Sequence, residues 1–176
     1  MRRSMKHCSA AMLAAVCAAG LQAQTMAAHI AESKLSYTTI RNNLVGMAEA
    51  MPADAYGFQP TPEIRTFGAL MAHVADANAR QCGVAMGEQK SVGAAAKTAK
   101  AELVQALKDS FTICDAAFDA LTEANALQPA GMNRSKLGLL NFNTMHDNEE
   151  YGYGAVYLRL KGVVPPSTAS RGRGGR

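Results

Sequence analysis

The spacing of apolar residues between positions 98 and 121 constrains the fold of this chain most strongly. Apolar side chains and one cysteine recur there every three or four residues, at Leu103, Leu107, Phe111, Cys114, Phe118 and Leu121. A repeat close to 3.6 residues places these side chains on one face of an α-helix. Because such a face has to be buried against another element, the segment predicts a helix within a larger helical assembly.

Three further segments have helical character. The first spans about residues 28–51 and ends before Pro52, since the residue before a proline disfavours the helical conformation. The second begins near Thr66, a residue type that caps helix N-termini, and fades at Gly87. The last covers about residues 139–161. Four amphipathic helices without a convincing pair of strands predict an all-α fold, a four-helix bundle.

The N-terminal segment has the pattern of a secretory signal peptide. Arg2, Arg3 and Lys6 precede an uncharged apolar stretch, and residues 1–23 end on the small Ala23. We expect cleavage after Ala23 and a periplasmic or secreted protein. The stretch is too short for a stable membrane span, which needs about 20 apolar residues. A buried N-terminal helix is the alternative interpretation.

The opposite end, residues 167–176, is rich in Arg and Gly and predicts a disordered tail, which leaves residues 24–166 as the folded domain. The whole chain has 18 basic and 14 acidic residues and a net charge of +4. Three of the basic residues lie in the signal segment and three in the tail, which leaves 12 basic against 14 acidic residues between them. The positive charge therefore does not predict a nucleic-acid partner for the folded domain.

Two cysteines, Cys82 and Cys114, remain once the signal segment is removed. In an exported protein such a pair is a disulfide candidate, which would join two neighbouring helices. Two buried free thiols that pack as small apolar residues are the alternative.

The sequence lacks the motifs of several common enzyme classes. It contains no Gly-x-Ser-x-Gly elbow, no phosphate-binding Gly-x4-Gly-Lys-Ser/Thr loop and no Gly-x-Gly-x-x-Gly. It also lacks a His-Glu-x-x-His pair, a Cys-x-x-Cys-His haem attachment and the paired Glu-x-x-His motifs of di-iron bundles. These absences exclude the enzyme classes that those motifs define.

The last helical segment carries the strongest candidate site. His146 and Glu150 are four residues apart, so they share one face of the helix. His73, in the second helical segment, would complete a set of two histidines and one carboxylate, which can hold a divalent ion and leave positions open for water or substrate. The alternative is a hydrogen-bonded surface pair of His146 and Glu150, worth about 0.3–0.5 kcal/mol.

Four neighbours of these residues are also candidates for a role. Asp76, one turn from His73, could orient that histidine, and Tyr153 could assist at the site. Gly152 and Gly154 each cost a helix about 1 kcal/mol relative to alanine. That cost indicates the close approach of another backbone or of a ligand, or a helix irregularity.

Four stretches of the sequence together resemble the DinB-like superfamily (DinB/YfiT type), over about residues 28–167. They are MPADAYGFQPTP at 51–62, RTFGALMAHVADAN at 65–78, HDNEEYG at 146–152 and YLRLKGVVPP at 157–166. The resemblance implies a four-helix bundle with a metal site near one end. The ligands of the superfamily are typically three histidines, and His73 and His146 match the first two. The third position falls on Glu150, a departure that still allows zinc, nickel, manganese or iron.

Relatives in this superfamily include thiol-S-transferases that use bacillithiol or mycothiol and a maleylpyruvate isomerase. Because those thiols are cytoplasmic and this chain carries an export signal, the resemblance implies only a metal-dependent enzyme of transferase or hydrolase type. The alternatives are a non-catalytic exported bundle that has lost the metal site and a structural module. The expected partner is a small-molecule substrate or ligand, and the sequence leaves a homodimer open.

Overall fold

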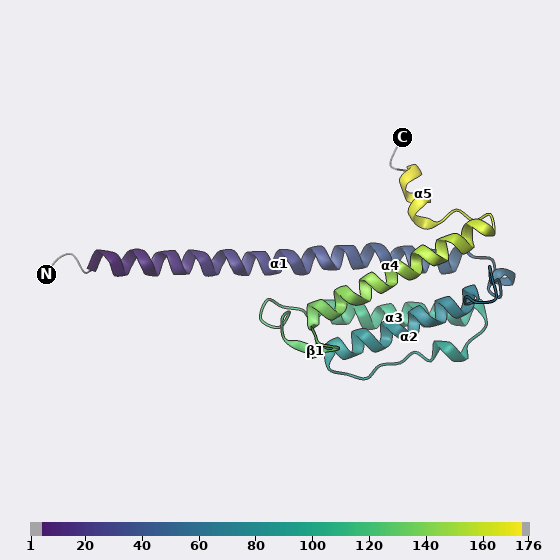
Figure 1. Cartoon of the computed structure of the whole chain (residues 1–176), viewed down its shortest axis with the longest axis horizontal. Coiled ribbons are helices and arrows are strands. Elements are labelled where there is room, and N and C mark those ends of the chain that lie inside the picture. Colours follow the sequence, from purple (N-terminus) through teal and green to yellow (C-terminus); the bar gives the residue numbers. More distant parts are fainter. Residues whose placement is uncertain (1–4, 174–176) are drawn as a thin grey trace.

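The computed structural model describes the backbone of residues 5–173 and the side chains of residues 26–170. The predicted signal peptide, with its cleavage after Ala23, therefore lies outside the part whose side chains are described. Four long helices pack as a bundle, which confirms the all-α prediction (Figure 1): α1 (Met5–Ala50), α2 (Phe67–Met86), α3 (Lys100–Asp119) and α4 (Lys136–Leu160). Within the described residues no helix is both long and apolar enough to cross a membrane.

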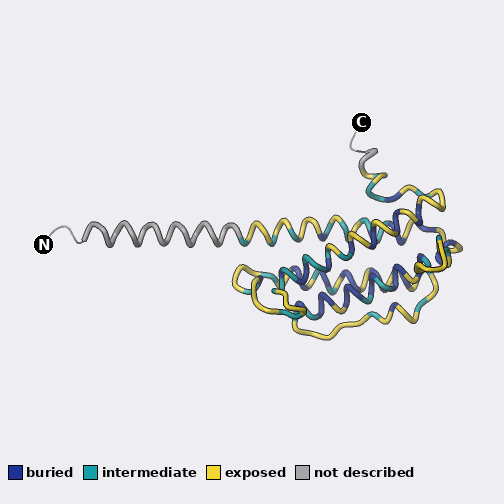
Figure 2. The backbone as a smooth tube through the Cα atoms, viewed as in Figure 1, coloured by how far each residue is buried: buried dark blue, intermediate teal, exposed yellow. Residues whose placement is uncertain are grey.

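The apolar faces of the four helices meet in one core, where the buried residues gather in Figure 2. The face of α3 that the sequence predicts is buried from Leu103 to Phe118. Tyr37 of α1 stacks on Phe118 with ring centroids 4.4 Å apart, and its hydroxyl donates to Asp115 at 2.8 Å. These contacts bury the second half of α1 against α3, whereas the stretch from 26 to 36 is largely exposed.

The helix ends follow the local sequence at most positions. Thr66 caps α2, since its side chain accepts a hydrogen bond from the Ala69 amide at 3.2 Å, and Gly87 ends the helix with a φ of 80°. The N-terminus of α4 lies earlier than the sequence predicts. Ser135 caps it by accepting from the Gly138 amide at 3.1 Å, so that the helix begins at Lys136 rather than near residue 139.

A short hairpin precedes α4, although the sequence predicts no strand pair. It pairs β1 (Pro129–Gly131) with β2 (Arg134–Ser135) in antiparallel fashion. Its two-residue turn, Met132 and Asn133, has φ values of 52° and 54°. Asn adopts this left-handed conformation readily, whereas Met rarely does, so the usual sequence signal of such a turn is absent here.

The predicted disordered tail is a further correction, because α5 (Pro166–Arg173) is helical. Contacts with α4 attach this helix to the bundle: the Tyr151 hydroxyl donates to Ser167 Oγ at 2.9 Å and accepts from the Ser167 amide at 3.0 Å, and Arg159 donates to Thr168 Oγ1 at 3.3 Å. Pro166 suits a first helical position, where no amide hydrogen is needed. Composition predicted disorder, whereas tertiary contacts order this segment. Residues 174–176 lie outside the described part of the chain.

Cys82 of α2 and Cys114 of α3 form a disulfide, with Cα atoms 5.0 Å apart. Both cysteines are fully buried. Of the two interpretations that the sequence leaves open, the structure has the disulfide, which joins the middle of the bundle across 32 positions of sequence.

The two glycines of α4 have different surroundings. A Cβ atom at Gly154 would overlap the Sδ and Cε atoms of Met47 in α1, whereas one at Gly152 would meet nothing within 4 Å. Gly154 therefore permits close packing, but against a side chain rather than a backbone or ligand.

We expect Gly154→Ala to lower the free energy of unfolding by about 1–3 kcal/mol, the usual cost of overpacking a core, because Met47 is fully buried. Gly152→Ala is the matched control and should raise it by up to about 1 kcal/mol through helix propensity. Urea denaturation of both variants measures the difference. Equal changes in both would show that Met47 can move aside without cost.

Candidate metal centre

Two helices that pack against each other bring the predicted ligands together. His73 lies in the second turn of α2, between the buried Ala72 and Val74, and it faces α4. His146 and Glu150 lie one turn apart on α4, as predicted. The three residues form the one group of His, Cys, Asp or Glu side chains, among those described, whose ligand atoms could hold a metal ion.

The ligand atoms form a small triangle. The two histidine Nε2 atoms are 3.1 Å apart, and Glu150 Oε1 lies 3.4 Å from His73 Nε2 and 3.5 Å from His146 Nε2. Two donors about 2.1 Å from one ion are separated by about 3.0 Å in octahedral and about 3.4 Å in tetrahedral coordination. The triangle therefore fits three protein donors around one divalent ion without rearrangement.

Glu150 supports this fit through its burial. Its side chain is only 8% exposed, and Oε2 has no hydrogen-bond partner among the described residues. A buried carboxylate is costly unless it is paired, hydrogen-bonded or bound to a metal. A surface pair of His146 and Glu150, the alternative from the sequence, does not match this burial.

A comparison of the sequence with protein-family models gives a match to the DinB superfamily over residues 36–153. The chain belongs to the DinB superfamily. The matched region covers most of the chain and includes His73, His146 and Glu150. No curated protein matches the sequence.

In this DinB-superfamily site the two histidines have pKa values shifted in opposite directions. Burial, together with the positive charge of Arg65, lowers the pKa of His73. The carboxylate of Asp147 raises the pKa of His146 and outweighs the effect of burial. His146 Nδ1 is 3.7 Å from Asp147 Oδ1, longer than a hydrogen bond, so the carboxylate acts mainly through its charge. The lowered pKa keeps His73 in the neutral form that ligates metals.

Asp147 is a residue whose role the sequence analysis missed. It is 1% exposed, and burial raises its pKa to about 6. With the Asn78 side-chain amide oriented so that its nitrogen faces Asp147, that nitrogen donates to both Asp147 oxygens, at 2.9 and 3.1 Å. The Asn143 side chain donates to Asp147 Oδ2 at 3.4 Å. This buried network fixes Asp147 behind His146. The spacing of Asn143 and Asp147, four residues apart, is the signal in the sequence that could have indicated it.

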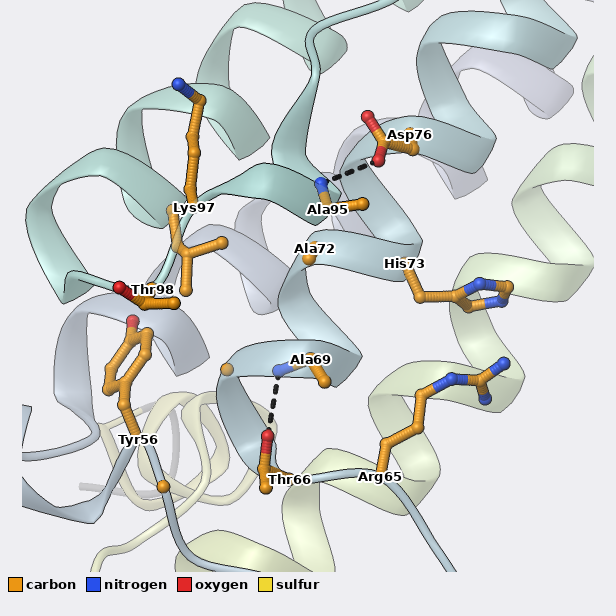
Figure 3. Close-up of a pocket in the computed structure, with 13 residues that line it drawn as sticks. Tyr56, Arg65, Thr66, Ala69, Ala72, His73, Asp76, Ala95, Lys97 and Thr98 are labelled. Atoms are coloured by element: carbon orange, nitrogen blue, oxygen red, sulfur yellow. Dashed lines mark hydrogen bonds between the residues drawn. The ribbon is translucent and has the colours of Figure 1, made fainter.

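Asp76, predicted to orient His73, has a different role. Its two carboxylate oxygens accept hydrogen bonds from the backbone amides of Ala94 and Ala95, both at 2.9 Å. These bonds hold the short helix η2 (Ala94–Ala96) against α2. Figure 3 shows the Asp76 side chain turned toward Ala95 and away from the His73 ring. In this structure the partners of Asp76 therefore come from a loop further along the chain rather than from His73.

Tyr153, which the sequence suggests as an assisting residue, is bonded to a neighbouring side chain of α4. Its hydroxyl donates to Glu149 Oε1 at 3.0 Å, and the residue is 54% exposed. The ring nevertheless lines the same cavity as Glu150. Tyr153 is therefore placed to contact a ligand in that cavity with its ring rather than to assist a ligand atom with its hydroxyl.

Two cavities flank the cluster. One, of about 550 Å³, lies along α2 and is lined by His73 together with Tyr56, Thr66 and Lys97 (Figure 3). The other, of about 580 Å³, lies between the loop before α2 and the outer face of α4, with Glu150 in its wall. Arg65, which the sequence analysis did not single out, lines both.

Proposed function

We propose that this chain is an exported metal-dependent enzyme of transferase or hydrolase type. The observation that carries the proposal is the convergence of two imidazole nitrogens and a buried carboxylate oxygen within 3.5 Å of one another. This donor set suits zinc, nickel, manganese or iron. His73, His146 and Glu150 would hold the ion.

A divalent ion bound by these residues would supply Lewis-acid chemistry, which lowers the pKa of a water or thiol nucleophile. The side chains around the cluster would orient the ligands and give a substrate access to the ion. The Asp147 carboxylate faces His146 Nδ1, the ring nitrogen that would remain free when Nε2 binds the ion. Glu150 opens onto the larger cavity, which gives a small molecule access to the cluster.

Export is supported by two features of the chain. The first 23 residues have the pattern of a signal peptide. The disulfide between Cys82 and Cys114 is of a kind that persists in oxidising compartments such as the periplasm. Mass spectrometry of the protein recovered from the periplasm tests this part, with an N-terminus at Gln24 as the expected result.

A non-catalytic binding protein is the second candidate function. The titratable side chains near the cluster that could act as a general base are engaged elsewhere. Asp76 caps η2, Asp147 is buried among amides and Tyr153 pairs with Glu149. This arrangement favours ligand binding without turnover.

Metal titration of the purified protein tests the proposal. After dialysis against EDTA we expect the chain to bind one equivalent of zinc, nickel, manganese or ferrous ion. At a concentration about 1,000 times Kd, binding stabilises the folded state by about 4 kcal/mol, which raises Tm by about 10 °C for a chain of this size. Isothermal titration calorimetry and thermal denaturation measure both quantities. A protein that takes up no ion, with an unchanged Tm, contradicts the metal-dependent function.

A further inference from the structure

The cavity between the loop before α2 and the outer face of α4 has an apolar wall. Ile64 and Leu70 form one side, and Val156 and the Tyr153 ring form the other. Glu150 is part of the same wall, so the cavity reaches the metal cluster. Its volume of about 580 Å³ lies within the range of small-molecule sites, about 300–1,000 Å³.

Three large apolar side chains of this cavity remain exposed in the folded chain. Ile64 is 43% exposed, Val156 52% and Tyr153 54%. Single exposed apolar residues are ordinary, but a group of them around one concave site marks a surface that a ligand covers. An apolar ligand body would remove these three side chains from water together.

Arg65 gives the cavity a specific polar group. Its backbone carbonyl accepts a hydrogen bond from the Tyr157 hydroxyl at 2.7 Å, which attaches it to α4. Among the described residues, the Arg65 guanidinium has no hydrogen-bond or ion-pair partner. In Figure 3 the Arg65 side chain extends to the same side of α2 as the His73 ring. A fixed backbone with an unpaired guanidinium is suited to bind an anionic group of a ligand.

Glu63 limits the charge of such a ligand. This exposed carboxylate lies on the rim of the same cavity, and Glu150 lies deeper. Two carboxylates near a single guanidinium disfavour a polyanion such as a phosphate ester. They leave room for one negative charge, placed directly on Arg65.

We propose that this cavity binds a small monocarboxylate with an apolar body, with its carboxylate on Arg65 and its apolar part against Ile64, Val156 and Tyr153. The proposal rests on the proposed function in one respect, that the bound molecule lies beside Glu150 and thus next to the metal. Arg65 then determines specificity for the substrate, and it does so in the absence of metal as well.

Calorimetry with 4-phenylbutanoate tests the proposal, with 4-phenylbutanamide as its uncharged counterpart. We expect the full chain, freed of metal with EDTA, to bind the carboxylate at least about tenfold more tightly than the amide. Arg65→Gln should abolish this preference. Lys97→Gln is the matched control, because Lys97 lines the cavity along α2 but not this one, and it should bind like the wild type.

A second pair of variants tests the apolar wall. Val156→Ser should weaken binding of both probes several-fold, whereas Leu160→Ser should not. Leu160 is 58% exposed on the same helix but does not line the cavity. Amide protons that shift in NMR spectra on addition of the probe should belong to residues 60–65 and 150–157.

The outcomes separate this proposal from the metal site. Equal affinity for carboxylate and amide, or a loss in Lys97→Gln equal to that in Arg65→Gln, overturns the role of Arg65. Binding of the carboxylate that requires added zinc and ignores Arg65→Gln overturns it too, since the metal would then be the anion site. Probe binding by a protein that takes up no metal would leave the proposal standing while the metal-dependent function fails.

Discussion

Replacing His146 by alanine is expected to weaken binding of a divalent ion by at least about 100-fold. Removal of a residue that merely orients a ligand typically costs 10–100-fold in metal affinity, and His146 supplies a donor atom of its own. The two atoms that remain, His73 Nε2 and Glu150 Oε1, are 3.4 Å apart and cannot enclose an ion. Competition with a chromophoric chelator measures the affinity. His29→Ala, which removes an exposed histidine, is the control and should leave it unchanged.

The role of the Glu150 carboxylate can be tested by comparison with its neighbour in sequence, Glu149. Glu150→Gln keeps the shape of a buried side chain and removes its charge. Glu149→Gln makes the same chemical change on the exposed side of α4, where Glu149 pairs with Tyr153. We expect only Glu150→Gln to reduce metal affinity. Equal affinity in the two variants would mean that two histidines alone account for binding.

Folding has to be separated from ligation in these variants. Each is compared by urea denaturation without metal, where the wild type has no ligand to lose. Glu150→Gln should not be less stable there, because Glu150 Oε2 has no partner among the described residues and a neutral amide is cheaper to bury. Weaker metal binding in a variant of unchanged stability then reports on the donor set itself.

Most of the bundle follows from local sequence. The apolar spacing of residues 103–118 is a property of one helix, and the Thr66 cap depends on residues within the next turn. Features that depend on distant contacts were missed. The hairpin turn requires Met132 in a left-handed conformation, and α5 depends on contacts between Ser167 and Tyr151. Neither leaves a signal in the local pattern.

The candidate site likewise has features that follow from local sequence and features that depend on distant contacts. His146 and Glu150 are four residues apart on one helix, so their shared face follows from the periodicity alone. That His73 meets them depends on how α2 packs against α4. The residue types suggested His73 as the third ligand, and the resemblance to the DinB-like superfamily supported that choice. The partner of Asp76 could not be found in this way, because the amides of residues 94 and 95 reach it through a loop. Arg65 was missed because nothing around it in sequence marks an unpaired side chain.

Removal of the disulfide between Cys82 and Cys114 is expected to lower the free energy of unfolding by about 3–4 kcal/mol. The bond spans 32 positions of sequence, and closing a loop of that length removes about this much conformational entropy from the unfolded chain. For a chain of this size the loss corresponds to a fall in Tm of about 10 °C. In a background with Cys8 and Cys17 replaced by serine, thermal denaturation with and without dithiothreitol measures the effect on this bond alone.

The Cys82→Ala/Cys114→Ala double variant distinguishes the two ways in which this bond could stabilise the bundle. The reduced wild type keeps both buried sulfur atoms and loses only the cross-link, whereas the double variant loses the sulfur volume as well. If loop closure dominates, as we expect, reduction alone accounts for most of the loss, and the double variant is only slightly less stable. A reduced protein as stable as the oxidised one would assign the stabilisation to packing.

Asn143 Nδ2 lies 3.9 Å from Cys114 Sγ and also contacts Asp147. The double variant removes this contact, whereas the reduced wild type keeps the sulfur atom beside Asn143 and Asp147. We therefore expect metal affinity to fall more in the double variant than in the reduced wild type.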